Sequence, residues 1–226
     1  MTLSEFLFPE EKRPLGTGSA DAMVQKEIGR LHLSCATEDR DEEATYDGVL
    51  ANNFGLRDKE TVTSLSATCA SWRMTELFRE KAVVPFEFAT LEDIHGALYG
   101  DIYPSAGMVR TTEIAPYCMA SFIEKEGERI VSGIQATKYL KLAGKEETAS
   151  FLAHFLSDLS ALHPFHQGNA EAFLCFSVRI GSYAGFSFDW DRTDKVTLLS
   201  RMERAVSGDI QPLLFSMRSM VQREST

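Results

Sequence analysis

The sequence predicts a mainly α-helical domain with one small β element. Apolar residues recur at helical spacing in most of the longer segments between glycines and prolines. Only residues 107–123 combine β-branched and aromatic residues in the way that is typical of a strand. The 226 residues, of which 44% are hydrophobic and 25% are charged, suffice for one domain with a large apolar core. We therefore expect a helical bundle that carries a small β-hairpin flap.

Six segments show the helical pattern, and residues that start or stop helices flank them. They span residues 21–33, 59–79, 90–100, 134–162, 169–184 and 193–205. In the third segment Thr90 is the candidate N-cap and Gly100 is the stop. In the fourth, Gly144 is a candidate break in an otherwise long helix.

The β element is predicted in residues 107–123, where Pro116 interrupts the β-branched and aromatic run. Proline has no N–H to donate to a sheet, so this segment is expected to be an edge strand or hairpin. Residues 1–45 mix glycine, serine, proline and charge, which predicts an N-terminal arm or accessory helix. Residues 46–226 are expected to form the main domain.

The charge and cysteine content exclude several classes of function. The formal net charge of -10 and the absence of a basic patch disfavour binding to nucleic acid. The acidic stretch at residues 37–48 is expected to be a solvated loop. The four cysteines show no CxxC spacing, which favours free thiols in a reducing compartment. No signal peptide or apolar run of membrane-spanning length is present, so we expect a cytoplasmic protein without membrane contact, with secretion by another route left open.

The stretch from His163 to Asn169 lies between two of the predicted helices. Pro164 favours an extended conformation at His163, so the preceding helix is expected to end there. Gly168 permits a turn with positive φ, and Asn169 is a strong candidate N-cap for the next helix. Such a turn gathers backbone N–H groups at a helix N-terminus and favours a bound phosphate. His163 at its edge is a candidate general base, whereas a purely structural turn is the alternative.

Residues 163–174, HPFHQGNAEAFL, resemble the signature of the Fic (Fic/Doc) family, HPFx[DE]GNGRxxR. Residues 91–111 are similar to that family's LxxIHxxLFxDxYxWAGxxRT block, residues 184–190 to its AGYxxDW block, and residues 50–60 to its upstream NxLGI segment. The blocks occur in the family's order and cover roughly residues 45–220. The resemblance implies the Fic fold, so that residues 46–226 would be the Fic-like domain.

The resemblance also implies an activity: transfer of AMP or another phosphate-containing group from a nucleotide donor to a protein hydroxyl. His163 would be the catalytic base. Nucleotide and phosphate binding would fall to Phe165, Gly168, Asn169 and Ala170. The family implies ATP and Mg²⁺ as donor and cofactor, and a target protein as partner. An antitoxin-like regulator and a homo-oligomer are further possibilities from the family.

Four positions depart from the family signature. Gln167 replaces the acidic residue that binds Mg²⁺, and an amide oxygen is a weaker Mg²⁺ ligand than a carboxylate. Ala170 replaces the second glycine, while Glu171 and Leu174 replace the two phosphate-binding arginines. An arginine–phosphate hydrogen bond contributes roughly 1.5 to 3 kcal/mol, and a carboxylate at that position adds repulsion. The departures predict weakened or altered activity.

Two interpretations of Glu171 follow. In one, its carboxylate blocks the pocket for the terminal phosphate, as a glutamate from a separate [ST]xxxE[GN] motif does in other Fic proteins; this chain lacks that motif. In the other, Glu171 and Leu174 are ordinary residues of the helix surface and core. The chain is accordingly either a divergent transferase or a catalytically inactive binding module.

Arg110, Thr111 and Thr112 match the family's flap, which docks the target beside the active site. The alternative for Arg110 is a plain ion pair with Asp101. His95 matches a structural histidine of the family and is expected to be packed in its helix. His154 and Asp158 stand one helical turn apart, and His163 and His166 lie close in sequence, so a transition-metal site is a further alternative.

Overall fold

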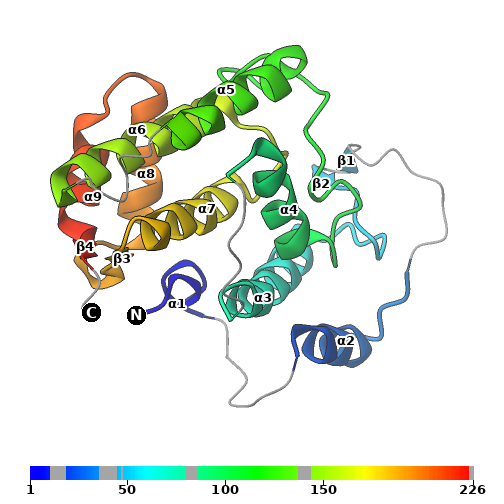
Figure 1. Cartoon of the computed structure of the whole chain (residues 1–226). Coiled ribbons are helices and arrows are strands. Elements are labelled where there is room, and N and C mark those ends of the chain that lie inside the picture. Colours follow the sequence, from blue (N-terminus) through cyan, green and yellow to red (C-terminus); the bar gives the residue numbers. More distant parts are fainter. Residues whose placement is uncertain (11–18, 36–44, 47, 80–85, 137–143, 224–226) are drawn as a thin grey trace.

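A computed structural model describes residues 1–10, 19–35, 45–46, 48–79, 86–136 and 144–223 (Figure 1). The helices in these ranges are α1 (Leu3–Leu7), α2 (Ala20–Arg30), α3 (Lys59–Leu77), α4 (Phe88–Tyr99), α5 (Ile123–Ala136), α6 (Lys145–Leu162), α7 (Asn169–Tyr183), α8 (Lys195–Val206) and α9 (Gln211–Met220). The strands are β1 (Thr45–Tyr46), β2 (Val49–Leu50), β3 (Phe186–Phe188) and β4 (Val221–Arg223), and two 3₁₀ turns span Ala120–Phe122 and Trp190–Arg192. The predicted mainly α-helical fold with a small β component is confirmed.

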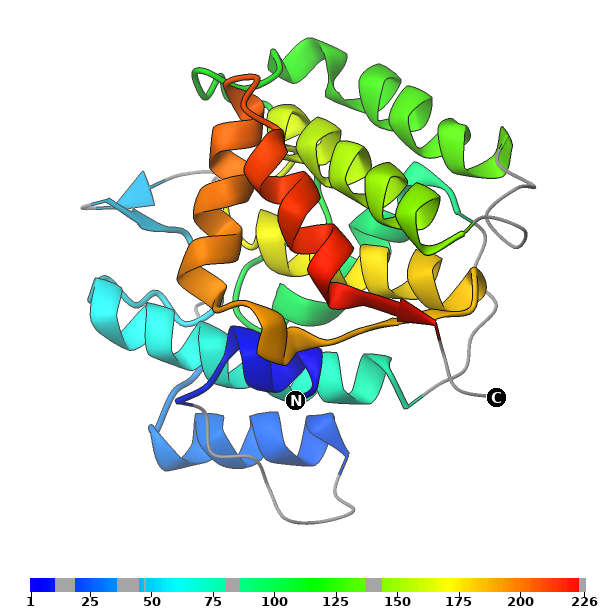
Figure 2. The same ribbon diagram turned by 90° about the vertical axis from the view of Figure 1, so that its left-hand side faces the viewer.

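Helix α7 forms the centre of the bundle. Figures 1 and 2 show it between α5 and α6 on one side and α1 and α3 on the other. It is apolar around most of its circumference, and the side chains of Phe173, Leu174, Cys175 and Phe176 are all at most 1% exposed. A helix that is apolar on all faces is stable only where other helices cover it. Helices α4, α6 and α1 pack against α7, and α8 and α9 pack against α6.

The β structure lies elsewhere than predicted. Strands β1 and β2 pair antiparallel with Thr45 opposite Leu50, and β3 pairs antiparallel with β4, with Phe188 opposite Val221. Residues 107–119 contain no strand; they form turns and irregular backbone, and helix α5 begins at Ile123. The prediction of a strand at 107–123 is therefore wrong in position. The backbone groups of this loop bond to the Arg110 side chain, to Ala161 at the end of α6 and to Pro164 in the loop after it, and form no ladder. Apolar content alone does not distinguish such a loop from a strand.

Several element boundaries also differ from the predicted ones. Thr90 lies inside α4, whose N-cap is Glu87. The long pattern at 134–162 is divided between α5 and α6, and the candidate break at Gly144 is confirmed, because Gly144 is the N-cap of α6. Helix α9 was not assigned from the sequence. Residues 36–44 and 47 lie outside the described residues, and with them most of the predicted acidic loop.

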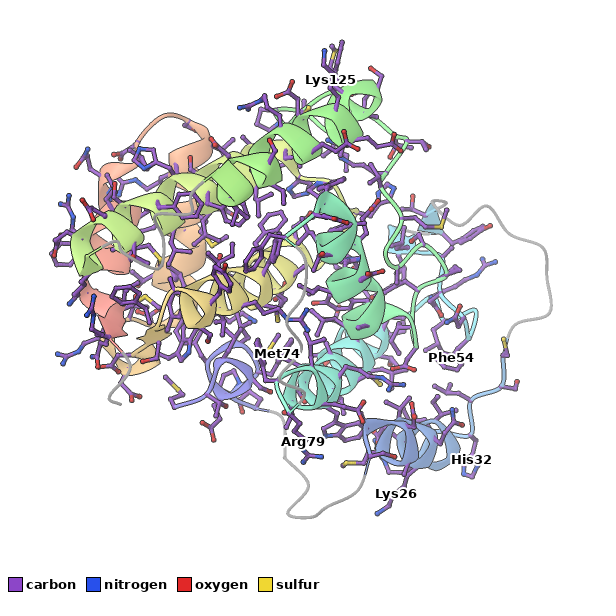
Figure 3. All side chains as sticks on the ribbon, viewed as in Figure 1. Lys26, His32, Phe54, Met74, Arg79 and Lys125 are labelled. Carbon is purple, nitrogen blue, oxygen red and sulfur yellow. The ribbon has the colours of Figure 1, made fainter. Side chains whose placement is uncertain are left out.

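The two N-terminal helices attach in different ways. The side chains of Leu3, Phe6 and Leu7 on α1 are buried in the core. Helix α2 packs on α3 at the edge of the molecule, where Lys26 points outward while Met74 of α3 turns into the interior (Figure 3). The division at residue 45 stays a prediction. None of the helices in the described ranges is long and apolar enough to cross a membrane.

Candidate functional site

The loop between α6 and α7 begins with a strained residue. Helix α6 ends at Leu162, as predicted, but His163 adopts left-handed backbone angles, φ 46° and ψ 62°, and is not extended. This conformation closes the end of α6 and turns the chain sharply before Pro164. A residue other than glycine in this region costs roughly 1–3 kcal/mol, so the surrounding structure must hold it.

Arg110 provides that support. Its side chain is 1% exposed, and it donates hydrogen bonds from Nε to the His163 carbonyl at 2.8 Å, and from its two terminal nitrogens to the carbonyls of Thr112 at 2.6 Å and Cys118 at 2.5 Å. Its backbone N–H donates to the Pro164 carbonyl at 2.8 Å. The guanidinium thus ties the 110–118 loop to the 163–164 turn. The alternative pairing with Asp101 is wrong, because that carboxylate binds Arg73 at 2.8 Å.

The His163 ring is held by two neighbours. Tyr117 stacks on it with ring centroids 3.8 Å apart and planes 9° apart. Asn169 Nδ2 lies 3.3 Å from His163 Nε2 and donates to the Phe165 carbonyl at 2.8 Å, while its Oδ1 accepts from the Phe165 N–H at 3.0 Å. Because this orientation places the amide's N–H groups toward both partners, Nε2 of His163 is the acceptor and carries a lone pair.

The electrostatic surroundings favour the neutral form of His163. Burial, followed by the positive charges of Arg110 and His166, lowers the pKa of His163 from 6.5 to about 4. At neutral pH the imidazole is therefore unprotonated and able to accept a proton.

Gly168 starts helix α7. It has φ +70°, and a Cβ atom built on it would lie 2.2 Å from the Tyr99 ring, so both the turn and the close packing require glycine. The predicted N-cap was Asn169, but Gly168 is the N-cap and Asn169 is the first residue of the helix. The Asn169 side chain instead folds back onto the turn, as its bonds to Phe165 show. The N–H groups of the first helical turn have no partner within the helix.

The side chain of His95 supports this turn through hydrogen bonds and stacking. Its Nε2 donates to the Gln167 carbonyl at 2.9 Å, and its Nδ1 accepts from the Gly107 N–H at 2.8 Å. The ring stacks on Phe165 with centroids 3.8 Å apart. Burial lowers the pKa of His95 to about 4, which favours the neutral ring that this bonding requires.

Two cavities border the N-terminus of α7. The proximal cavity, of about 230 Å³, has a wall of loop residues and a wall from α8. It is lined by Tyr117, Ser160, His163, His166, Gln167, Gly168, Asn169, Ala170, Glu171, Phe173, Leu199, Met202, Glu203 and Val206. The α8 wall was missed from the sequence, where Leu199, Met202 and Val206 show only helical spacing.

The distal cavity, of about 340 Å³, lies between α1, α3, α4 and the start of α7. It is lined by Leu7, Phe8, Pro9, Glu10, Thr63, Ser66, Ala67, Tyr99, Tyr103, Gln167, Gly168, Glu171 and Lys195. Gln167, Gly168 and Glu171 line both cavities, so the two are neighbours across the first turn of α7.

Comparison with known proteins places this arrangement in a family. A probable protein adenylyltransferase of Sinorhizobium fredii, y4lH, is 30% identical over 178 residues, which is 76% of this chain and 91% of the relative. The chain belongs to the Fic family. The probable protein adenylyltransferase Fic of Escherichia coli is 30% identical over 127 residues, 54% of this chain and 64% of that protein. No family model matches the chain.

The Fic fold is also found by structural comparison. The BepC effector protein of Bartonella tribocorum, solved with bound AMPPNP, superposes with a TM-score of 0.74 at 21% identity, covering 83% of this chain and all of that chain. The N-terminal Fic domain of a Bep effector protein from Bartonella quintana, solved with bound ADP, superposes with a TM-score of 0.71 at 19% identity, covering 78% of this chain and 92% of that chain.

The remaining Fic signature positions differ in accessibility. Phe165 and Leu174 are at most 1% exposed and belong to the core, which agrees with the interpretation of Leu174 as a packing residue. Thr111 and Thr112 are exposed. Arg110 is too deeply buried for its own side chain to contact a docked protein, so we revise its predicted docking role to that of a loop anchor.

Glu171 of this Fic chain faces the distal cavity as well as the proximal one. Its Oε1 lies 3.8 Å from Lys195 Nζ, and its side chain is 16% exposed. The carboxylate is also close enough to Tyr99 to raise the pKa of that phenol further, after the larger effect of burial. Lys195 in turn donates to the Leu7 carbonyl at 2.6 Å.

The donor set of the loop is a poor fit to Mg²⁺. Gln167 offers a neutral amide oxygen, and its Nε2 is buried without a hydrogen-bond acceptor. Within the ranges that the structure describes, no group of three or more His, Cys, Asp or Glu residues could hold a metal ion. His154 is exposed and bonds through Nδ1 to the Ser150 carbonyl of its own helix.

Proposed function

We propose that this Fic protein transfers a nucleoside monophosphate group, with AMP as the form expected from its relatives, from a nucleotide donor to a hydroxyl of a target protein, and that it uses ATP weakly. The observation that carries the proposal is His163. Its imidazole is neutral, is fixed between Tyr117 and Asn169, and lies on the wall of the proximal cavity beside the N-terminus of α7. The names of the curated relatives, protein adenylyltransferases, support the same reaction class.

The reaction step follows from this geometry. The target hydroxyl takes the place of the Asn169 N–H at Nε2 of His163 and gives its proton to that nitrogen, and its oxygen forms a bond to the phosphorus that is attached to the nucleoside. The bond from that phosphorus to the bridging oxygen breaks, and the leaving group departs with the electron pair. The N–H groups of Asn169, Ala170 and Glu171 and the positive end of the α7 dipole favour the phosphate oxygens. Phe165 contributes through its backbone position, since its ring is buried.

The weak use of ATP follows from charge. Glu171 and Glu203 line the proximal cavity, and no arginine or lysine is among its lining residues in the described part of the chain. Arg110 is near, but carbonyl oxygens engage its guanidinium. A terminal phosphate brings roughly 1.5 to 2 negative charges, so the two carboxylates oppose its binding in this cavity. Gln167 further weakens the family's Mg²⁺ site.

The test is labelling of a bacterial lysate, and of the protein itself, with ATP labelled on the α-phosphate. We expect weak labelling by the wild type and none by His163→Ala, whereas His166→Ala, which changes the neighbouring histidine of the same loop, keeps a measurable rate. Labelling that persists in His163→Ala would disprove the role of His163.

A second candidate function is a binding module without turnover, which the carboxylate of Glu171 at the border of both cavities favours. Calorimetry with ATP separates the two. If neither the wild type nor Glu171→Gly binds any nucleotide, the binding-module function is preferred. An antitoxin-like regulator, a homo-oligomer and a cytoplasmic location stay predictions from the sequence.

A further inference from the structure

The distal cavity differs from the proximal one in what it offers a ligand. Both share Gln167, Gly168 and Glu171, so the distal cavity is the neighbour, across the first turn of α7, of a donor whose reactive phosphorus lies beside His163. Its volume of about 340 Å³ is within the range of small-molecule sites, which begin at roughly 300 Å³. The group that occupies it is the far end of the leaving portion of the donor, beyond the bridging phosphate.

The charges that line the two cavities do not suit a terminal phosphate. Among their described lining residues are three carboxylates, Glu10, Glu171 and Glu203, and a single lysine, Lys195. The lysine is committed to other partners: Nζ donates to the Leu7 carbonyl at 2.6 Å, lies 3.8 Å from Glu171 and lies 5.3 Å above the centre of the Phe8 ring. An additional dianionic group would have Glu171 beside it and no free cation to balance it.

The same cavity is rich in uncharged hydrogen-bonding groups. Hydroxyls come from Thr63, Ser66, Tyr99 and Tyr103, of which Tyr99 already interacts with Glu171 and Tyr103 with Ser66. Gln167 adds an amide whose Nε2 is buried near Tyr103 without a hydrogen bond of normal geometry. Burying such a donor unsatisfied is costly, and a ligand hydroxyl would relieve that cost. Glu171, an acceptor only, suits the paired hydroxyls of a sugar.

We propose that the distal cavity binds an uncharged, hydroxyl-rich group, and that the donor is therefore a nucleoside diphosphate sugar. This inference rests on the proposed function of His163 and names its donor class. The target hydroxyl loses its proton to Nε2 of His163 and bonds to the phosphorus attached to the nucleoside. The bond from that phosphorus to the bridging oxygen breaks, and the sugar phosphate leaves with the electron pair. No redox partner is needed.

The test is calorimetry on the His163→Ala variant, which binds without turnover. Two series of ligands are compared. The adenine series is ATP, ADP and ADP-glucose, and the uracil series is UTP, UDP and UDP-glucose. The affinity for each diphosphate sugar is thus compared with that for nucleotides of the same base. In the series that binds, the nucleoside diphosphate sugar is expected to bind at least about tenfold more tightly than the triphosphate. Glu171→Arg should reverse this order by strengthening the triphosphate, while Tyr103→Phe should weaken only the sugar ligand.

The outcomes separate the two proposals. If a triphosphate binds as tightly as the corresponding diphosphate sugar, or if Glu171→Arg leaves the order unchanged, the sugar site is disproved and the nucleotide site stands. If no member of either series binds to the wild type or to the variants, the proposed function fails as well. Glu60→Gln, which changes an exposed carboxylate of α3 that lines neither cavity, serves as the matched control for Glu171 and should leave the order of affinities unchanged.

Discussion

Arg110 holds His163 by its main chain: the Nε of the buried guanidinium donates to the His163 carbonyl at 2.8 Å, across 53 residues of sequence. The same guanidinium satisfies two further carbonyls, and the Arg110 N–H satisfies that of Pro164. A residue that was predicted to meet a target protein thus fixes the left-handed turn that presents the base.

Replacing Arg110 should destabilise the protein. In Arg110→Met three partly buried carbonyls lose their donor. An orphaned buried group costs about 1–3 kcal/mol and a partly solvated one less, so we expect a loss of roughly 3 kcal/mol in the free energy of unfolding. Urea denaturation measures it. Arg110→Lys keeps the charge but cannot reach all three carbonyls, and its loss should be intermediate. A stability equal to that of the wild type in Arg110→Met would contradict the anchoring role.

As the pH is lowered, the transfer activity should fall only near pH 4. Burial and the charges of Arg110 and His166 lower the pKa of His163 to about 4, so the base stays neutral well below the ordinary histidine pKa of 6.5. NMR titration of the His163 ring protons tests this without any substrate. His154, which is exposed on α6, is the internal reference in the same spectra. Titration of His163 near pH 6.5 would show that the ring is not held in this environment.

His95 should make stability depend on pH. Its pKa is about 4 in the folded protein and 6.5 in the unfolded chain, so between these values the unfolded state binds more protons and stability falls as the pH is lowered. The full loss from this group is about 3 kcal/mol. Unfolding free energies measured from pH 7 to pH 4.5 in the wild type and in His95→Gln should differ in slope, with the variant flatter. His154→Gln, which makes the same change at an exposed position of α6, is the matched control.

Gly168→Ala should lower the stability of the protein more than an alanine at another glycine of positive φ does. The new Cβ would lie 2.2 Å from the Tyr99 ring, in addition to the strained backbone at φ +70°. Backbone strain and overpacking together cost roughly 2–5 kcal/mol. Gly185→Ala has φ +81° with no atom within 4 Å, so it should show the backbone cost alone. Thermal denaturation compares the two, and equal losses would mean that the Tyr99 contact is unimportant.

The local features of the loop at residues 163–169 could be predicted from the sequence. The features that depend on contacts with distant segments could not. The end of α6 at Leu162 and the positive φ of Gly168 followed from Pro164 and from glycine chemistry. The backbone of His163 was predicted wrongly, because the preference before proline is weaker than the combined hydrogen bonds from Arg110. Thr90 was predicted as an N-cap from local rules, but tertiary packing extends α4 to Phe88.

By itself, the sequence determined the mainly α-helical class, the Fic signature blocks, the candidate base and the substitutions Gln167, Glu171 and Leu174. These depend on residue type and short spacing, which a chain displays before it folds. Only the tertiary structure decided that Arg110 faces inward, that α8 closes the proximal cavity and that Glu171 meets Lys195 from the start of α8. Those contacts join residues tens of positions apart, and their partners are chosen by packing and by the need of each buried polar group for a hydrogen bond.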